Sequence, residues 1–260
     1  MRRSVLFVPA VRPDRFEKAV ATGADAICLD LEDGVSFNEK DKGRDLALAL
    51  LSDRPSCRAE VVLRVNEPAS ELGERDLAAL LDADVRPDAL MVPKVGGPET
   101  IEALERRLAP RLEGLPLVAQ IETASGLAAA EAIATASPNI AVMFFGAVDL
   151  SADLGCAIEW DALLYARSRV VAAAALVGVD AMDTPFMDVS APEQLGDEAR
   201  AVRRLGFTGK AAIHPTQVPI IQQAFSPDEK TVAWARRVVE AYEINAGGRV
   251  ASGRQAGRAP

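Results

Sequence analysis

Eight short apolar runs that recur along the chain are the feature that most constrains its fold. The runs are SVLFV from Ser4, AICLDL from Ala26, VVLRV from Val61, ALMVPKV from Ala89, LVAQIE from Leu117, IAVMFF from Ile140, VDAMD from Val179 and KAAIH from Lys210. Segments with helical patterns separate them. Successive starts differ by between 22 residues (Ser4 to Ala26) and 39 residues (Ile140 to Val179), so each step can hold one strand, one helix and two short connections. Eight such steps predict an α/β protein with a closed TIM-like (β/α)8 barrel.

A doubly wound sheet is the alternative architecture, because it also alternates strands and helices. The sequence has neither a G-x-G-x-x-G turn after a strand nor a phosphate-binding P-loop. The number and regular spacing of the runs therefore favour the barrel, and we expect the barrel domain to occupy residues 1–245.

The last helix of this domain is expected just after Pro227. Ser226, followed three residues later by Glu229, has the form of a capping box. An apolar stripe follows, made of Val232, Ala235, Val238, Val239 and Tyr242. Residues 246–260 are rich in Gly and Ala and contain no acidic residue, so we expect a disordered tail there.

Charge, cysteine and histidine content exclude several classes of function. A formal net charge of −9 disfavours a general nucleic-acid or anionic-membrane binder. The three cysteines form no CxxC pair, which argues against a disulfide framework or a thiolate zinc site and favours a reducing, cytoplasmic setting. The longest apolar stretch, 170–179, is far shorter than the roughly 20 residues that span a bilayer. With His214 as the one histidine, carboxylates must do most of the chemistry.

Polar residues stand at the ends of most of the apolar runs. In a TIM barrel the carboxyl ends of the strands form the rim that carries the active site. Seen singly, such a residue most often meets solvent or caps the next helix, but polar ends on seven of the eight runs weaken that interpretation for the set. The residues are Asp30, Glu32, Asp33, Arg64, Asn66, Lys94, Gln120, Glu122, Asp149, Asp183 and His214.

Glu122 and Asp149, at the ends of the fifth and sixth runs, are the best candidates for a metal site. Mg²⁺ prefers oxygen ligands and often takes one or two carboxylates, leaving its other positions to water and substrate. The alternative is that Asp149 forms a structural ion pair with Arg64 or Lys94. The residues alone leave both open.

The basic and aromatic candidates carry less specific signals. Arg64 offers a planar fork suited to a carboxylate or an enolate oxygen. We expect Lys94 to offset the acidic cluster of Asp30, Glu32 and Asp33 and not to act as a Schiff-base lysine. Phe7, Arg12 and Lys18 surround the end of the first run. They fit an ordinary solvated face, or else an aromatic surface with two cations for a phosphorylated ligand.

Taken in order, seven motifs resemble one known family, the β-subunit-like proteins of citrate lyase within the HpcH/HpaI aldolase and malyl-CoA lyase superfamily. The resemblance covers about residues 3 to 245. It is carried by LFVPAVRPDRFEKA, CLDLEDGV, LRVN, VPKV, QIETASG, FGAVDLSADLG and GFTGKAAIHPTQ. Each motif alone is weak, but together they are highly specific.

The resemblance implies a TIM-like barrel with Mg²⁺ on Glu122 and Asp149, and with Arg64 and Glu122 near an acid substrate. It also implies that the backbone amides of Gly146 to Asp149, Ala147 among them, receive a carboxylate, and that Phe7, Arg12 and Lys18 meet coenzyme A. The family reaction makes or breaks a carbon–carbon bond between an acyl-CoA enolate and a 2-oxo acid. A homo-oligomer, a trimer or hexamer, is implied as well.

One departure from the family pattern concerns the acid that moves the proton. Related lyases commonly continue into a C-terminal flap that brings an aspartate to a neighbouring subunit's site, whereas this sequence has no Asp or Glu after Glu243. We expect the tail 246–260 to lack that flap. An internal acid (Asp30, Glu32 or Asp33) can substitute, a partner can supply the flap, or the lyase activity is altered.

The preferred hypothesis is a Mg²⁺-dependent lyase for malyl-, citramalyl- or citryl-CoA, with Arg64, Glu122, Asp149, Glu32 and Asp33 as catalytic residues. One alternative is a CoA-independent aldolase for 4-hydroxy-2-oxo acids. Another is a carrier-protein-dependent or non-catalytic subunit of a lyase complex.

Overall fold

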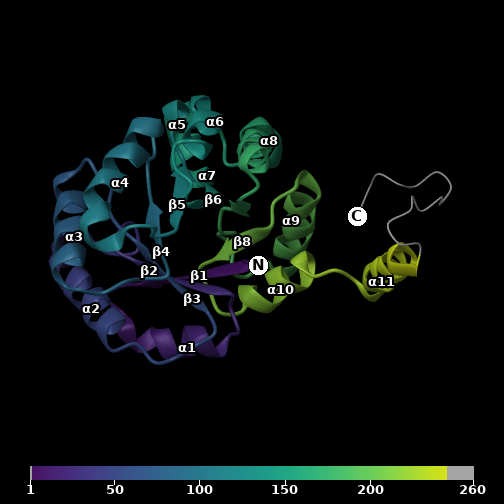
Figure 1. Ribbon diagram of the computed structural model, residues 1–260, viewed down its shortest axis with the longest axis horizontal. Helices are drawn as coiled ribbons and strands as arrows, with labels where there is room; N and C mark the ends of the chain where they lie inside the picture. Colours follow the sequence, from purple (N-terminus) through teal and green to yellow (C-terminus); the bar gives the residue numbers. More distant parts are fainter. Residues whose placement is uncertain (1, 245–260) are drawn as a thin grey trace.

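The computed structural model describes residues 2–244, and eight parallel strands close into a barrel in sequence order (Figure 1). The strands are β1 (Ser4–Pro9), β2 (Ala26–Asp30), β3 (Glu60–Arg64), β4 (Ala89–Val92), β5 (Leu117–Ile121), β6 (Ile140–Phe145), β7 (Asp180–Asp183) and β8 (Gly209–Ala212). β8 pairs with β1, which closes the ring. The predicted (β/α)8 barrel is confirmed.

Helices follow the strands, and all but the last of them surround the barrel. They are α1 (Phe16–Ala21), α2 (Lys40–Ser52), α3 (Glu71–Asp82), α4 (Pro98–Leu112), α5 (Ala124–Ala128), α6 (Ala130–Ala134), α7 (Ala147–Leu154), α8 (Trp160–Val177), α9 (Pro192–Leu205), α10 (Gln217–Phe225) and α11 (Glu229–Ile244), with short 3-10 turns at Pro13–Arg15 and Phe37–Glu39. Capping residues determine where several of these helices begin or end. The Ser70 hydroxyl accepts the Gly73 amide at 3.1 Å to start α3, and α9 stops at Gly206, whose φ of 111° suits glycine.

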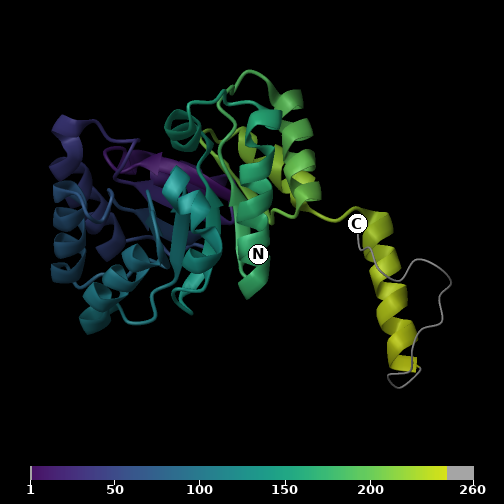
Figure 2. The same cartoon turned by 90° about the horizontal axis from the view of Figure 1, so that it is seen from above.

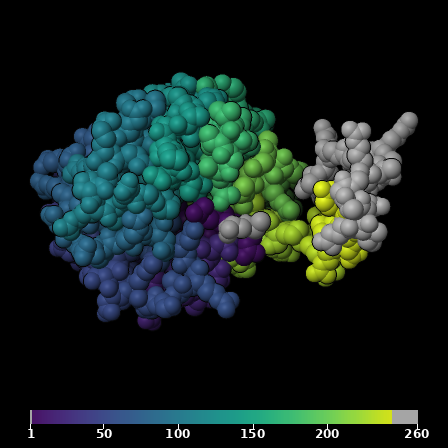
Figure 3. Space-filling model, in the orientation of Figure 1, coloured from purple at the N-terminus to yellow at the C-terminus, as the bar shows by residue number. Residues whose placement is uncertain are grey.

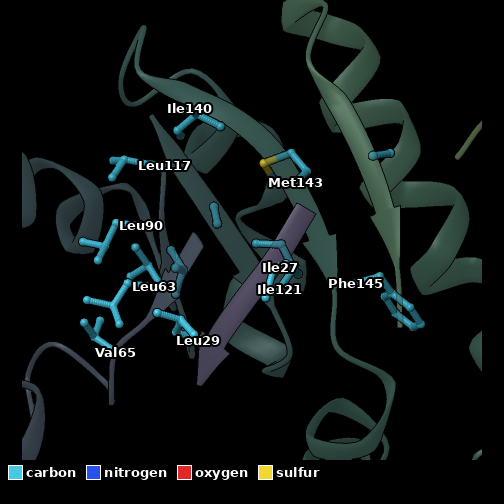
Figure 4. Packing of buried hydrophobic residues seen from close by; sticks show 14 of the residues in the cluster. Ile27, Leu29, Leu63, Val65, Leu90, Leu117, Ile121, Ile140, Met143 and Phe145 are labelled. Atoms are coloured by element: carbon cyan, nitrogen blue, oxygen red, sulfur yellow. The ribbon is translucent and has the colours of Figure 1, made fainter. Parts of the chain in front are cut away.

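Alternation along the strands divides the buried side chains into two clusters. Ile27, Leu29 and Leu63 belong to the larger cluster, between sheet and helices (Figure 4), whereas Ala26 and Cys28 belong to a smaller cluster that fills the barrel. Burying a Leu or Ile side chain contributes about 1.5–3 kcal/mol, so the larger cluster supplies most of the stability. The same alternation decides which polar side chains at the strand ends point inward, towards the rim of the barrel.

Asp183 shows the consequence of this alternation. Met182 belongs to the inner cluster, so its neighbour Asp183 faces outward and is fully buried against the helices. Its carboxylate meets Lys210 Nζ at 2.5 Å and Arg167 Nε at 3.1 Å. Lys210 also contacts Glu198 at 2.6 Å. The expectation that Asp183 belongs to the rim is therefore wrong, since this residue is part of a buried ion-pair network.

Helix α11 forms where the sequence predicts it but stands clear of the barrel (Figures 1 and 2). The expected capping box is wrong: Ser226 is the C-cap of α10, while Asp228 Oδ1 accepts the Thr231 amide at 2.7 Å. Much of the predicted apolar stripe is exposed, with Val239 and Tyr242 at 56% and 57%. The space-filling view shows α11 as a separate lobe (Figure 3). The expected tail at 246–260 lies outside the described residues.

The helices of residues 2–244 include none that is both long enough and apolar enough to cross a membrane.

Candidate active site

A pocket of about 810 Å³ opens at the carboxyl ends of the strands. Nine of the ten predicted site residues line it, although they come from segments spread over most of the barrel. They are Phe7, Arg12, Lys18, Asp33, Arg64, Glu122, Gly146, Ala147 and Asp149. Glu32 is the tenth; it is buried and does not line the pocket.

Arg64 is held rigidly at the base of this pocket. Its Nε and Nη2 each donate to one oxygen of Asp30 at 2.7 Å, a bidentate pair between neighbouring residues of β2 and β3. Its guanidinium carbon lies 4.9 Å from the centre of the Phe7 ring. The fork that we expected to meet substrate is thus occupied by Asp30, and Nη1 is the nitrogen that faces Glu32 and Asp33 at 2.8 and 3.4 Å.

Asp30 has no capacity left to act as a base. Besides Arg64, its oxygens accept the amides of Glu32 at 2.9 Å and Gly34 at 2.8 Å. A Cβ on Gly34 would lie 2.5 Å from Asp30 Oδ2, so only glycine allows this close approach. Asp30 therefore shapes the loop that follows β2, and of the three acids proposed from the sequence Glu32 and Asp33 remain.

Glu32 is a buried carboxylate without hydrogen-bond donors. Neither oxygen has a hydrogen bond, because Arg64 Nη1 is close to Oε2 but poorly directed, and Lys94 Nζ is 3.8 Å from Oε1. Burial raises the pKa of Glu32 to about 8. From below, Lys40 Nζ donates to the carbonyls of Leu31 and Glu32 at 2.7 and 2.6 Å, which fixes the backbone here.

Glu122 is likewise buried but is firmly oriented. The Lys94 amide donates to its Oε1 at 2.8 Å, and Gln120 Nε2 donates to its Oε2. Burial raises the pKa of Glu122 to about 7. A Cβ on Gly146 would lie 2.6 Å from Glu122 Oε2, so the glycine leaves the space that this carboxylate needs.

Asp149 lies in the first turn of α7 and not at the tip of a strand, because β6 already ends at Phe145. Its side chain is 34% exposed, and its Oδ2 is 3.6 Å from Lys94 Nζ. The ion pair with Lys94 that the sequence left open is thus present. The pair with Arg64 is absent, since Arg64 contacts Asp30, Glu32 and Asp33.

The donor set fits a hard divalent cation that keeps several positions for other ligands. Among residues 2–244 there is no group of three or more His, Cys, Asp or Glu side chains placed to hold a metal ion. Glu122 and Asp149 line one pocket, and Mg²⁺ usually takes one or two carboxylates from a protein.

The start of α7 offers fewer free amides than we expected. The Gly146 amide donates to the Ile121 carbonyl at 3.1 Å, and the Ala147 amide points to Thr184 Oγ1 at 3.3 Å. The amides of Val148 and Asp149 have no hydrogen-bond partner among residues 2–244, and the helix dipole favours an anion there. Thr184, which also lines the pocket, was not singled out from the sequence.

The three residues proposed for coenzyme A occupy different depths. Phe7 is deep, in an edge-on contact with Phe144 at 6.2 Å and against Arg64. Arg12 lies at the exposed mouth and pairs with both oxygens of Asp14, at 2.8 and 2.7 Å. Lys18 lines the same mouth, as does His214, whose Nδ1 is 2.7 Å from Thr216 Oγ1.

A rim pocket of this kind on a closed parallel barrel has the organisation of a TIM-barrel enzyme. Comparison with known proteins gives the family. The model of the HpcH/HpaI aldolase/citrate lyase family matches residues 3–215. The chain therefore belongs to this family, and the expectation of an enzyme of the lyase class is confirmed.

The relatives and solved structures support the same assignment. Citramalyl-CoA lyase, mitochondrial, from Rattus norvegicus is 33% identical over 93% of this chain and 76% of its own. A citrate lyase subunit beta-like protein of Mycobacterium tuberculosis is 37% identical over 93% and 85%. The structure of CitE from M. tuberculosis in complex with magnesium, acetoacetate and coenzyme A superposes with a TM-score of 0.79 at 35% identity, covering 97% of this chain and 90% of CitE.

Proposed function

We propose that this protein is a Mg²⁺-dependent carbon–carbon lyase that cleaves, or forms, a short 3-hydroxy-dicarboxylic acyl-CoA such as malyl-, citramalyl- or citryl-CoA. The products of cleavage are an acyl-CoA and a 2-oxo acid. The observation that carries the proposal is that Glu122, Asp149 and the clamped Arg64 line a single pocket. The similar CitE structure has magnesium, acetoacetate and coenzyme A bound, which supports the same ligand classes here.

Cleavage of such a substrate develops negative charge on a ketone oxygen and on a thioester enolate. Glu122 and Asp149 would hold Mg²⁺, which when bound polarises the oxygen of the 2-oxo acid. The Arg64 guanidinium supplies positive charge for the enolate, and its two hydrogen bonds to Asp30 keep it from moving. The free amides at the start of α7 would receive the distal carboxylate of the substrate.

A base must take the hydroxyl proton during cleavage. Glu32 is our candidate, because burial raises its pKa to about 8 and its oxygens have no hydrogen-bond donors. Asp33 is the alternative, since it lines the pocket and contacts Arg64 Nη1 at 3.4 Å. Replacing each in turn separates the two.

The test of the function is a cleavage assay on malyl-CoA, citramalyl-CoA and citryl-CoA, with Mg²⁺ and with EDTA. We expect at least one substrate to yield an acyl-CoA and a 2-oxo acid, and we expect EDTA to abolish turnover. Absence of turnover by the chain alone, together with co-purification of carrier or transferase subunits, would instead support a subunit of a lyase complex.

Binding of the CoA moiety is expected to depend on the pocket mouth. Replacing Arg12 or Lys18 with Ala should weaken the affinity for CoA about tenfold each, because each removes a charge-assisted contact to phosphate. Isothermal titration with CoA measures this, and Lys42→Ala is the matched control, since Lys42 of α2 is exposed and pairs with Glu39. Unchanged CoA affinity in both variants would favour the CoA-independent aldolase.

Assembly and setting belong to the proposal as well. The exposed apolar face of α11, with Trp234, Val239 and Tyr242 at 43%, 56% and 57%, supports a homo-oligomer, a trimer or hexamer, which sedimentation equilibrium of the full chain would measure. The three free cysteines fit a reducing, cytoplasmic setting, which cell fractionation would test.

A further inference from the structure

We propose that Lys94 is the internal counter-ion of the metal site: its ammonium pairs with Asp149 while the site is free of metal, and Asp149 exchanges this ammonium for the ion. Lys94 is then a positioning residue that sets how tightly the metal binds. The inference rests on the proposed function, because it takes Glu122 and Asp149 as the metal ligands. It also explains why the sequence permitted two partners for Asp149, since the two belong to different states of the site.

The first observation is that one residue lies close to three of the carboxylates of the site. The Lys94 amide donates to Glu122 Oε1 at 2.8 Å. Its Nζ lies 3.6 Å from Asp149 Oδ2 and 3.8 Å from Glu32 Oε1. The backbone of Lys94 therefore orients one proposed ligand while its side chain neutralises the other.

The backbone conformation that permits this is uncommon. Lys94 has a φ of 51°, in the left-handed region, where residues other than glycine, asparagine and aspartate are rare. Pro93 precedes it in the connection between β4 and α4. A glycine would adopt this φ more easily, but it would not carry an ammonium towards Asp149 and Glu32.

The second observation is that the basic side chains of the site pair with different carboxylates. Arg64 forms ion pairs with Asp30, Glu32 and Asp33. Within residues 2–244, Lys94 is the basic side chain that forms an ion pair with Asp149. A divalent cation that enters between Glu122 and Asp149 must therefore compete with this ammonium.

The geometry also gives the displaced ammonium a second partner. Glu32 Oε1 is close to the same Nζ, so Lys94 can release Asp149 without being left unpaired in a half-buried position. The exchange then costs less than the loss of an isolated ion pair would. The side chain of Lys94 is 38% exposed, which leaves it room to move.

The experiment is a calorimetric titration of metal-free protein with Mg²⁺. Lys94→Met removes the charge and keeps the length of the side chain, and we expect it to bind Mg²⁺ about tenfold more tightly than wild type, because the competing cation is gone. Lys94→Arg keeps the charge and should bind within about twofold of wild type. Lys42→Met removes an equal charge from an exposed site and should bind as wild type does.

A second readout needs no metal. In EDTA, Lys94→Met should melt at a lower temperature than wild type, because Asp149 and Glu32 lose their shared cation, whereas Lys42→Met should melt with the wild type. Lys94→Gln serves in the same measurements if the methionine variant does not fold.

The outcomes separate the inference from the function on which it rests. If wild type binds Mg²⁺ and Lys94→Met binds it equally or more weakly, the counter-ion role is overturned and the metal site stands. Weaker binding in both Lys94→Met and Lys94→Arg would overturn it too, since only the orientation of Glu122 would then matter. If wild type shows no Mg²⁺ binding, the proposed metal site itself fails.

Discussion

Asp149→Asn is expected to lower Mg²⁺-dependent turnover of the best acyl-CoA substrate by about 10³-fold, because a bound metal supplies several kcal/mol of charge stabilisation in the transition state. Asparagine keeps the size of the side chain but removes the charge that would hold the ion. The measurement is kcat/KM at saturating Mg²⁺, together with a direct titration of the metal.

The fold should survive this change. Asp149 is 34% exposed and its ion pair with Lys94 is long, so the melting temperature should fall no further than that of Lys94→Met. Asp161→Asn is a suitable control, since Asp161 is an exposed acid in the first turn of α8. Full Mg²⁺-dependent activity in Asp149→Asn would contradict the proposed metal site.

Glu122→Gln should produce the same loss of activity, but it also disturbs hydrogen bonds within the protein. The carboxylate of Glu122 accepts from the Lys94 amide and from Gln120 Nε2, whereas a glutamine offers only one accepting oxygen. One of the two donors would therefore lose its partner. This cost is partly offset because the raised pKa of Glu122, about 7, shows that burial already disfavours its charge.

The barrel could be predicted from the sequence because its signal is repeated eight times. The spacing of the runs tolerates errors in any single strand, and closure follows from their number. The pairing of Asp30 with Arg64 could also have been predicted, since the two residues are in register on β2 and β3 and both face inward. What this inference needs is the register of neighbouring strands, which a list of strand ends does not contain.

Three features could not be read from strand ends. Asp183 is the last residue of its strand, but the alternation of side chains sends it outward to Lys210 and Arg167. Asp149 belongs to a helix whose start follows β6 by a single residue. The contact of Lys40 with the carbonyls of Leu31 and Glu32 joins a helix to a loop, and no local pattern marks it.

Glu32→Gln should have two effects of opposite sign. If Glu32 is the base, its loss lowers kcat/KM by about 10²–10⁴-fold, the usual contribution of a positioned proton acceptor. Glutamine has a similar volume and leaves the pair of Arg64 with Asp30 intact. Asp33→Asn is the matched control on the adjacent residue, and it should retain most of the activity. A large loss in Asp33→Asn with little loss in Glu32→Gln would assign the base to Asp33.

The second effect is on stability, and its sign follows from the pKa. Burial raises the pKa of Glu32 from an ordinary 4.5 to about 8, so the folded protein holds the proton more tightly than the unfolded chain does. The stability that this provides is fully present below about pH 4.5 and is lost as the pH rises through about 8. Glutamine cannot ionise. We therefore expect Glu32→Gln, in EDTA, to lose less unfolding free energy than wild type between pH 6 and pH 9.

Urea unfolding at these two pH values measures the difference, and Glu122 contributes a similar decline to both proteins because its pKa is also raised, to about 7. An equal decline in wild type and Glu32→Gln would show that Glu32 is already ionised in the folded protein at pH 6. A variant that is less active yet more stable at pH 9 would identify Glu32 as a group whose burial destabilises the fold at the pH where its charged form is needed. That combination is expected of a catalytic carboxylate and not of a structural one, because removing a structural ion pair lowers stability as well.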